Sequence, residues 1–321
     1  MYILTDLDNR TSFKNFQPFF LRDKSRINIL ALGDVGGTLL TGLKMMGADV
    51  VEHIGICDMN ADTATRYEME MNQIAFPFDG VKLPEVEIIT AEELFNGDVF
   101  VFCASKGIPA LDDKMQDVRM AQFENNKKLV EQYAALAADK NFKGLFAVVS
   151  DPVDPLCKAA YLAGRGKLLA EQIKGFGLGV MNSRAMYHAK KNNRFQQYLK
   201  EGRAFGPHGQ DLVIADSLLK YDDKLSRELT QLTVESNLRI REIGFKPYIA
   251  PAISSGAISI LLLLRGQWHY SSNFIGKDEE GAYVGALNRM TEQGLEFENI
   301  PIPEALFLRI KNAYDNLKEI V

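Results

Sequence analysis

The stretch INILALGDVGGTLLTGLKMMG (residues 27–47) decides the expected fold. Its first six residues form an apolar run with the length of a buried strand. The remainder is typical of a glycine-rich turn followed by a helix that ends at Gly47. A strand that leads through such a turn into a helix is the usual first unit of a parallel α/β sheet, so the stretch predicts where that sheet begins.

The residues around this unit continue the alternation of strands and helices. Further apolar runs typical of strands occupy 52–58, 98–104 and 144–150, and an amphipathic helix is expected over 123–140. The alternation predicts a doubly wound parallel sheet of the Rossmann type. Later residues are expected to form a mixed α/β part, with helices over 211–242 and 303–321 and an antiparallel meander over 272–300. The expected division is an N-terminal arm at 1–26, a dinucleotide-binding domain at 27–152 and a substrate domain at 153–321.

The composition of the chain argues against several kinds of binding partner and several protein classes. The chain has 321 residues and a formal net charge of −5, so it shows no basic footprint for nucleic acid. Its three cysteines (Cys57, Cys103 and Cys157) are widely spaced, which fits neither a disulfide framework nor a zinc site and suggests a reducing compartment. No metal ligand cluster is evident. The uncharged stretch 247–264 contains prolines, serines and a glycine, so a buried or subunit-interface helix is favoured over a membrane span. We expect a cytoplasmic protein.

The turn after the first strand matches a phosphate-binding fingerprint. In the pattern G-x-G-x-x-G, alanine replaces the first glycine at Ala31, and Gly33 and Gly36 fill the other two positions. The helix N-terminus, with Asp34 and Val35 in the turn, would supply N–H groups and positive potential to a pyrophosphate. Asp58 ends the second strand, where a carboxylate can accept hydrogen bonds from an adenosine ribose and repels a 2′-phosphate. The pattern predicts NAD as the cofactor.

Several motifs, taken in order, resemble the L-lactate/malate dehydrogenase family. They are INILALGDVGGTLLTGL, VFVFCAS, VRMAQFENN, VVSDPVDPL, GFGLGVMNSRAMYH and FGPHGQD, with YVGALNRMTEQGLE as a similar C-terminal meander. The resemblance implies a transfer of hydride between nicotinamide and a small 2-hydroxy or 2-keto acid. It also implies that Ala104, Asn126 and Ser150 contact the cofactor, and that the chain forms a homodimer or homotetramer.

The resemblance also assigns the chemistry to three side chains. His208 is expected to be the acid/base, a role that suits histidine because both of its protonation states are accessible near neutral pH. Arg184 would hold the substrate carboxylate through a bidentate fork that lysine cannot copy. Arg119 would polarise the carbonyl when the loop 105–119 closes over the site.

Two positions depart from the family pattern. The aspartate that orients the histidine in the family is replaced by Met181, and the asparagine of N-P-V-D is replaced by Asp151. One hypothesis is that the carboxylate has moved, so that Asp151 supports protonated His208. A second is that Asp151 binds a cationic group, which would favour an amino- or imino-substrate. The third is a nucleotide-binding protein whose catalysis is weakened or repurposed.

The loop SKGIPALDDKMQDVR bears on the substrate. It is longer than the family's usual loop and lacks the arginine that malate enzymes use for a second carboxylate. Asp112 and Asp113 would repel a dicarboxylate, although Lys106 and Lys114 could offset them. A lactate-like monocarboxylate is therefore expected over a malate-like substrate.

Overall fold

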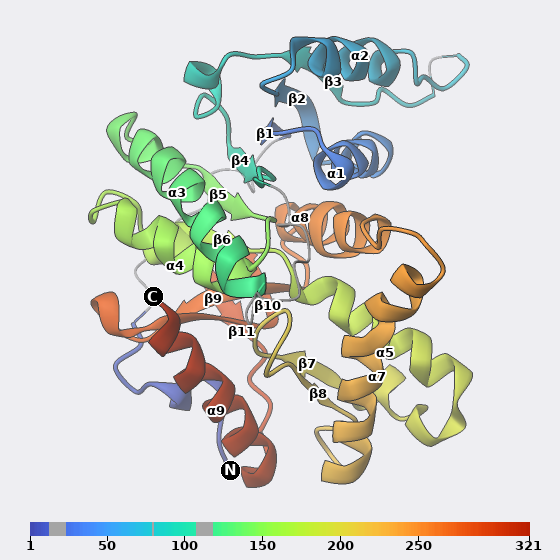
Figure 1. Cartoon of the computed structure of the whole chain (residues 1–321), viewed down its shortest axis with the longest axis vertical. Coiled ribbons are helices and arrows are strands. Elements are labelled where there is room, and N and C mark those ends of the chain that lie inside the picture. Colours follow the sequence, from blue (N-terminus) through green and yellow to red (C-terminus); the bar gives the residue numbers. More distant parts are fainter. Residues whose placement is uncertain (13–23, 79, 107–117) are drawn as a thin grey trace.

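A single large sheet forms the centre of the molecule (Figure 1). The computed structural model describes residues 1–12, 24–78, 80–106 and 118–321, with only the backbone for 118–122. Within these residues the sheet has nine strands in the order β11-β10-β9-β6-β5-β4-β1-β2-β3. The strands are β1 (Ser25–Leu30), β2 (Val51–Cys57), β3 (Glu85–Ile88), β4 (Val99–Phe102), β5 (Leu145–Val148), β6 (Ile173–Gly175), β9 (His269–Ile275), β10 (Ala282–Thr291) and β11 (Gly294–Phe297).

The first six strands form the doubly wound half of this sheet. Each pairs in parallel with its neighbour in the order 3-2-1-4-5-6, which is the Rossmann order. The predicted α/β fold with a doubly wound parallel sheet is confirmed. The antiparallel strands β9, β10 and β11 continue the sheet through one pair, Gly175 with Ser272, and they confirm the predicted meander.

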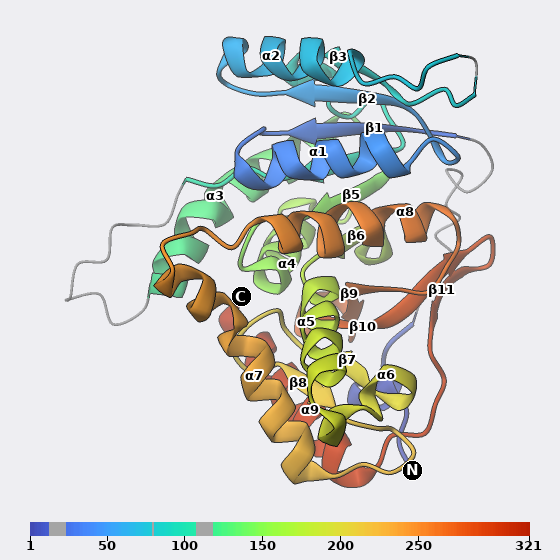
Figure 2. The same ribbon diagram turned by 90° about the vertical axis from the view of Figure 1, so that its right-hand side faces the viewer.

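Helices cover both faces of the parallel half because its strands are apolar on both sides. One face packs against α1 and α8, and the other packs against α3 and α4 (Figure 2). The helices are α1 (Asp34–Met46), α2 (Ala61–Asn72), α3 (Val118–Asp139), α4 (Val153–Ala163), α5 (Leu178–Lys191), α6 (Tyr198–Glu201), α7 (Asp223–Glu242), α8 (Ser259–Leu264) and α9 (Glu304–Ile320).

The predicted helix over 211–242 is wrong in its first part. Residues 213–215 form strand β8 (Val213–Ala215), which pairs in antiparallel fashion with β7 (Arg203–Phe205). Helix α7 starts only at Asp223, where the side chain of Asp222 accepts a hydrogen bond from the N–H of Leu225 at 3.0 Å. The apolar run before it therefore joins a small two-stranded sheet, whose connecting loop carries His208.

The apolar stretch 247–264 packs inside the molecule. It forms a π-helical segment, η6 (Pro251–Ile258), that continues into α8 and lies against α1. A Cβ on Gly42 of α1 would lie only 2.6 Å from Cβ of Ala257, so glycine is what permits this close approach. Among the described residues, no helix has both the length and the apolar character needed to cross a membrane.

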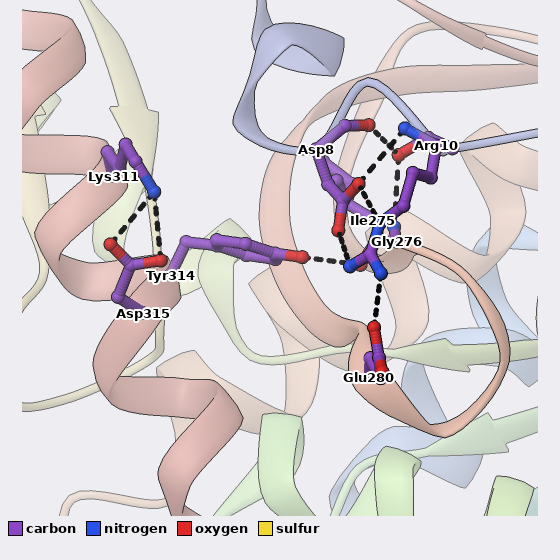
Figure 3. A network of polar contacts seen from close by, with 9 residues as sticks. Asp8, Arg10, Ile275, Gly276, Glu280, Lys311, Tyr314 and Asp315 are labelled. Atoms are coloured by element: carbon purple, nitrogen blue, oxygen red, sulfur yellow. Dashed lines mark hydrogen bonds and ion pairs between the residues drawn. The ribbon is translucent and has the colours of Figure 1, made fainter.

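The beginning of the chain packs against its end. Leu4 and Leu7 are buried in the same apolar cluster as α9, and the ring of Tyr2 stacks on Phe307 with 4.2 Å between centroids. Arg10 bonds to Asp8 and to Glu280, as Figure 3 shows. Residues 1–12 of the expected arm therefore contact the C-terminal part of their own chain. The division at 152/153 stays a prediction, because one sheet runs through both proposed domains.

Candidate active site

The turn between β1 and α1 has the close geometry that a fingerprint turn requires. A Cβ on Gly36 would lie 2.0 Å from the carbonyl oxygen of Ala31, so only glycine fits there. Ala31 itself has φ 72°, in the left-handed region that favours glycine. Ala31 thus occupies a backbone conformation that favours glycine, at a cost in strain.

The N-terminus of α1 opens onto free space. A Cβ on Gly33 would meet no atom within 4 Å, and the residue is exposed. The first N–H groups of a helix have no partner within it and carry the positive end of its dipole, which favours an anion. Asp34 lies in this turn, where its carboxylate is 3.1 Å from Nζ of Lys246. That lysine offsets the negative charge that Asp34 brings to the helix N-terminus.

Asp58 holds the glycine turn from the end of β2. Its Oδ2 accepts a hydrogen bond from the N–H of Leu32 at 2.6 Å, and its Oδ1 accepts one from the N–H of Asn60 at 2.9 Å. A carboxylate has about four acceptor sites, so these bonds leave capacity for a hydroxyl. Asp58 is therefore a structural brace of the turn, and its contact with a ribose stays a prediction.

Asn126 and Ser150 connect the ends of neighbouring strands. Asn126 is fully buried, and its side-chain amide donates to the carbonyl oxygen of Asp151 at 2.8 Å. Its Oδ1 accepts from the N–H of Lys106 at 3.1 Å, and the hydroxyl of Ser150 donates to the carbonyl of Ala104 at 2.7 Å. These bonds fix the backbone at the carboxyl ends of β4 and β5, where ligands of doubly wound sheets bind.

His208 meets Asp151 at this same edge. Nδ1 of His208 lies 3.0 Å from Oδ1 of Asp151. Asp151 lies three residues after the end of β5 and is joined to Pro152 by a cis peptide bond. The other ring nitrogen, Nε2, is buried and has no hydrogen-bond partner among the described residues. Asp151 fixes one side of the imidazole and leaves Nε2 for a ligand.

Two residues that sequence analysis did not single out hold His208 in place. Its backbone N–H donates to Oδ2 of Asp154 at 3.1 Å, and Asp154 also accepts a bond from Ser272. A Cβ on Gly177 would lie 2.8 Å from Cβ of His208, so the glycine before α5 lets the imidazole approach the backbone. Both residues occur within motifs quoted for the family resemblance, VVSDPVDPL and GFGLGVMNSRAMYH.

The carboxyl group of Asp154 has a raised pKa. It is only 3% exposed, and this burial raises its carboxyl pKa to about 6, against the opposing effect of its bonds from Ser272 and the backbone of His208. The carboxylate, in the first turn of α4, thus joins the loop that carries His208 to β9 through hydrogen bonds that its charged form accepts.

Arg184 is buried between α5 and α7, two helices that pack side by side (Figure 2). Its Nη1 lies 3.4 Å from Sδ of Met181, and its Nη2 donates to Oδ1 of Asn237 on α7. Burial lowers the pKa of the guanidinium to about 10, whereas the charge of Asp151 raises it, so Arg184 stays charged at neutral pH. Sequence analysis did not single out Asn237, because no local pattern links 184 to 237.

Asp151 relates His208 to Arg184. It bonds to the imidazole and interacts electrostatically with the guanidinium, so both predicted side chains lie around one carboxylate. The side chain of Arg119 and residues 107–117 lie outside the described residues. The predicted roles of Arg119 and of the loop acids therefore stay predictions. The described residues contain no group of three or more His, Cys, Asp or Glu that could hold a metal ion.

Comparisons with known proteins find that this chain is similar to lactate and malate dehydrogenases. No family model matches it. The curated L-lactate dehydrogenase of Mesomycoplasma hyopneumoniae is 22% identical over 292 residues, which are 88% of this chain and 86% of that protein. A lactate dehydrogenase from a Medee basin deep-sea metagenome library has a similar structure, with a TM-score of 0.75 at 14% identity over 93% of this chain and 98% of the other. The malate dehydrogenase of Archaeoglobus fulgidus, solved in complex with NADH, is also similar in structure. Its TM-score is 0.75 at 17% sequence identity, over 92% of this chain and 98% of the other.

This chain has a Rossmann half followed by a mixed α/β half with antiparallel strands. It shares this fold with the lactate and malate dehydrogenases named above. The curated relatives, at 22–25% identity, and the shared fold support a divergent relative of the L-lactate and malate dehydrogenases. At the level of the family this supports an oxidoreductase.

Proposed function

We propose that this protein is an NAD-dependent oxidoreductase that interconverts a small 2-hydroxy acid and its 2-keto acid. The observation that carries the proposal is the arrangement around His208. Asp151 holds Nδ1, Nε2 is buried without a partner among the described residues, and a charged arginine lies nearby. This is the set of groups that a proton transfer next to a carboxylate requires.

The residues of the β1–α1 turn fit a dinucleotide. Gly33 offers open space beside the N-terminus of α1, and Gly36 allows the tight turn. Asp58 retains acceptor capacity for a ribose and disfavours a 2′-phosphate, which supports NAD over NADP. Val35 would lie in the turn, and Ala104, Asn126 and Ser150 would border the ring at the strand ends. When bound, the nicotinamide would accept or supply the hydride.

His208 would move the proton at Nε2. In the oxidation direction the neutral imidazole takes the hydroxyl proton of the substrate, and in the reduction direction the imidazolium returns it to the ketone oxygen. The bond from Nδ1–H to Asp151 fixes the tautomer that leaves the lone pair on Nε2. The negative charge of Asp151 stabilises the imidazolium while it exists.

The position of Asp151 favours the relocated carboxylate among the three hypotheses for this site. Met181, at the position of the family's aspartate, contacts Arg184 through sulfur and offers no charge. Asp151 would supply the missing charge from the carboxyl end of β5. A substrate cation bound to Asp151 and a repurposed nucleotide-binding protein are the alternatives, and the assay below separates them.

Arg184 would bind the substrate carboxylate. Both of its hydrogen-bonded partners are uncharged, whereas the carboxylate of Asp151 offsets part of its positive charge through space. A buried charge of this kind is stabilised when an anionic ligand arrives.

Arg119 would polarise the carbonyl. The lactate-like preference over malate, the homodimer or homotetramer and the cytoplasmic location are carried forward as predictions. The free thiols of Cys57, Cys103 and Cys157 are consistent with a reducing compartment.

An NADH oxidation assay tests the proposal. Pyruvate, oxaloacetate and branched or aromatic keto acids are each supplied with and without ammonia. We expect turnover with monocarboxylate keto acids alone. Turnover that requires ammonia favours an imine substrate, and tight NADH binding without turnover on any substrate favours the repurposed protein.

A pair of histidine variants ties any activity to this site. His208→Gln should lower kcat by roughly 10²–10⁴-fold, the usual contribution of a general acid/base. His188→Gln is the matched control, because His188 lies on α5 and bonds to Ser236 rather than to the site. Equal activity of the two variants would contradict the assignment of His208.

A further inference from the structure

The guanidinium of Arg184 is held by a contact between two helices. Asn237 of α7 accepts a hydrogen bond from Nη2, while Met181, one turn before Arg184 on α5, lies 3.4 Å from Nη1. The guanidinium is therefore fixed from two sides inside the packed α5–α7 pair. A guanidinium has five N–H donors, so donors remain for a ligand after these two contacts.

The chemistry of the two acceptors matters more than their number. A buried arginine usually has a carboxylate partner, because an unpaired buried charge is costly. Here the amide of Asn237 and the thioether of Met181 accept without charge. They orient the guanidinium without adding negative charge to that of Asp151, which already interacts with it electrostatically. A carboxylate at 237 would satisfy the same hydrogen bond and would compete with the ligand.

We propose that Asn237 is a positioning residue of the substrate site, which orients Arg184 toward the substrate carboxylate and adds no negative charge of its own beside the guanidinium. This inference rests on the proposed function, since it needs a carboxylate substrate. The inference nevertheless goes beyond the proposed function, because it assigns a role in substrate affinity to a residue of α7. It predicts that charge at position 237 affects substrate affinity more than it affects stability.

Asn237→Asp distinguishes positioning from mere packing. The carboxylate preserves the hydrogen bond to Arg184 and adds an ion pair, so a purely structural role predicts an unchanged or raised Tm and normal kinetics. The positioning role predicts a retained Tm together with a rise in KM for the keto acid of roughly 10–100-fold, because the paired arginine no longer attracts the substrate. We expect kcat to change much less than KM.

Ser236→Ala is the matched control for Asn237→Ala. Ser236 is the neighbouring residue on α7, and it also links α7 to α5, with Oγ 2.9 Å from Nε2 of His188. Both variants remove one hydrogen bond between the same helices, so similar losses of Tm are expected. Only Asn237→Ala should raise KM, by roughly 10-fold.

The outcomes separate the two claims. If the wild-type protein reduces no keto acid, the proposed function is wrong and this inference falls with it. If the wild type is active and Asn237→Asp has normal KM, or if Ser236→Ala raises KM as much as Asn237→Ala does, Asn237 is a packing residue only and the inference alone is overturned.

Discussion

Nδ1 of His208 lies 3.0 Å from Oδ1 of Asp151, although 57 residues separate them in the chain. The contact forms because Asp151 follows a central parallel strand, and the β7–β8 loop brings His208 to the carboxyl end of that strand. A carboxylate therefore reaches the imidazole from a position where the family pattern has an amide.

Asp151→Asn should reduce turnover sharply. The amide keeps the size of the side chain but loses the charge that stabilises the imidazolium, and it no longer selects one tautomer. By comparison with other His–Asp pairs we expect kcat to fall roughly 10²–10⁴-fold, with NADH affinity unchanged. Steady-state kinetics and an NADH titration measure the two quantities. Asp211→Asn is the control. Asp211 lies in the β7–β8 loop that carries His208, but its carboxylate accepts a hydrogen bond from Asn316 and none from the imidazole. Wild-type kinetics in Asp151→Asn would eliminate the relocated-carboxylate hypothesis.

Gly33→Ala should weaken cofactor binding without destabilising the free protein. The added methyl group meets no atom within 4 Å, so the Tm measured without cofactor should change by less than about 2 °C. The methyl group would occupy the space that a pyrophosphate needs, and we expect the Kd for NADH to rise at least ~10-fold. Calorimetric titration measures it. Unchanged NADH affinity in this variant would mean that the dinucleotide does not approach this turn.

Ala31→Gly should stabilise the protein. Ala31 has φ 72°, which costs an L-residue about 1–2 kcal/mol, while glycine loses about 0.4–1 kcal/mol through the entropy of the unfolded chain. The net gain in the free energy of unfolding is therefore between about 0 and 1.6 kcal/mol, or about 0.8 kcal/mol at the midpoints of the two ranges. Urea denaturation measures it. Ala135→Gly, inside α3, is the comparison, since glycine there should destabilise by about 1 kcal/mol. If both substitutions destabilise equally, the turn carries no strain at Ala31.

Asp154 should contribute a distinct pH dependence to stability. Burial raises its pKa from 3.8 to about 6 in the folded protein, so the folded state binds more protons than the unfolded state between these values. The stability contributed by protonated Asp154 is fully present below pH 3.8 and is lost as the pH rises through about 6. The loss amounts to about 3 kcal/mol.

Asp154→Asn isolates this effect because the amide does not titrate. The free energy of unfolding of the wild type, measured relative to that of the variant, should fall between pH 4 and pH 6 and then level off. Urea titrations across this range measure the difference. A difference that is independent of pH would show that Asp154 has an ordinary pKa in the folded protein.

The parallel half of the fold was predictable from sequence because its signals are local. Apolar runs such as 27–32 and 144–150 have strand length, and the glycine turn after the first run marks a strand-to-helix unit. The segment 211–222 was assigned wrongly, because a short apolar run before an amphipathic helix looks continuous with it. Only the pairing of 213–215 with β7 shows that this run is a strand.

Some residues of the candidate site were likewise predictable from sequence, and others were not. His208, Arg184 and Asp151 were found from ordered motifs, and Asp151 was singled out because its charge breaks the family pattern. Asn237 gave no signal, because it acts through a single contact across a helix interface. Gly177 gave none either, since its importance lies in the distance to an imidazole 31 positions later.

The order of residues alone determined the doubly wound sheet and the position of the glycine turn, because hydrophobic period and turn chemistry act over a few neighbouring positions. It also supplied the candidate side chains for proton transfer and carboxylate binding, through motifs that resemble a known family. The tertiary structure decided which carboxylate meets the imidazole and which groups surround the buried guanidinium. Those contacts join strand ends and helices that are far apart in the chain, and their geometry exists only once the sheet has brought them to one edge.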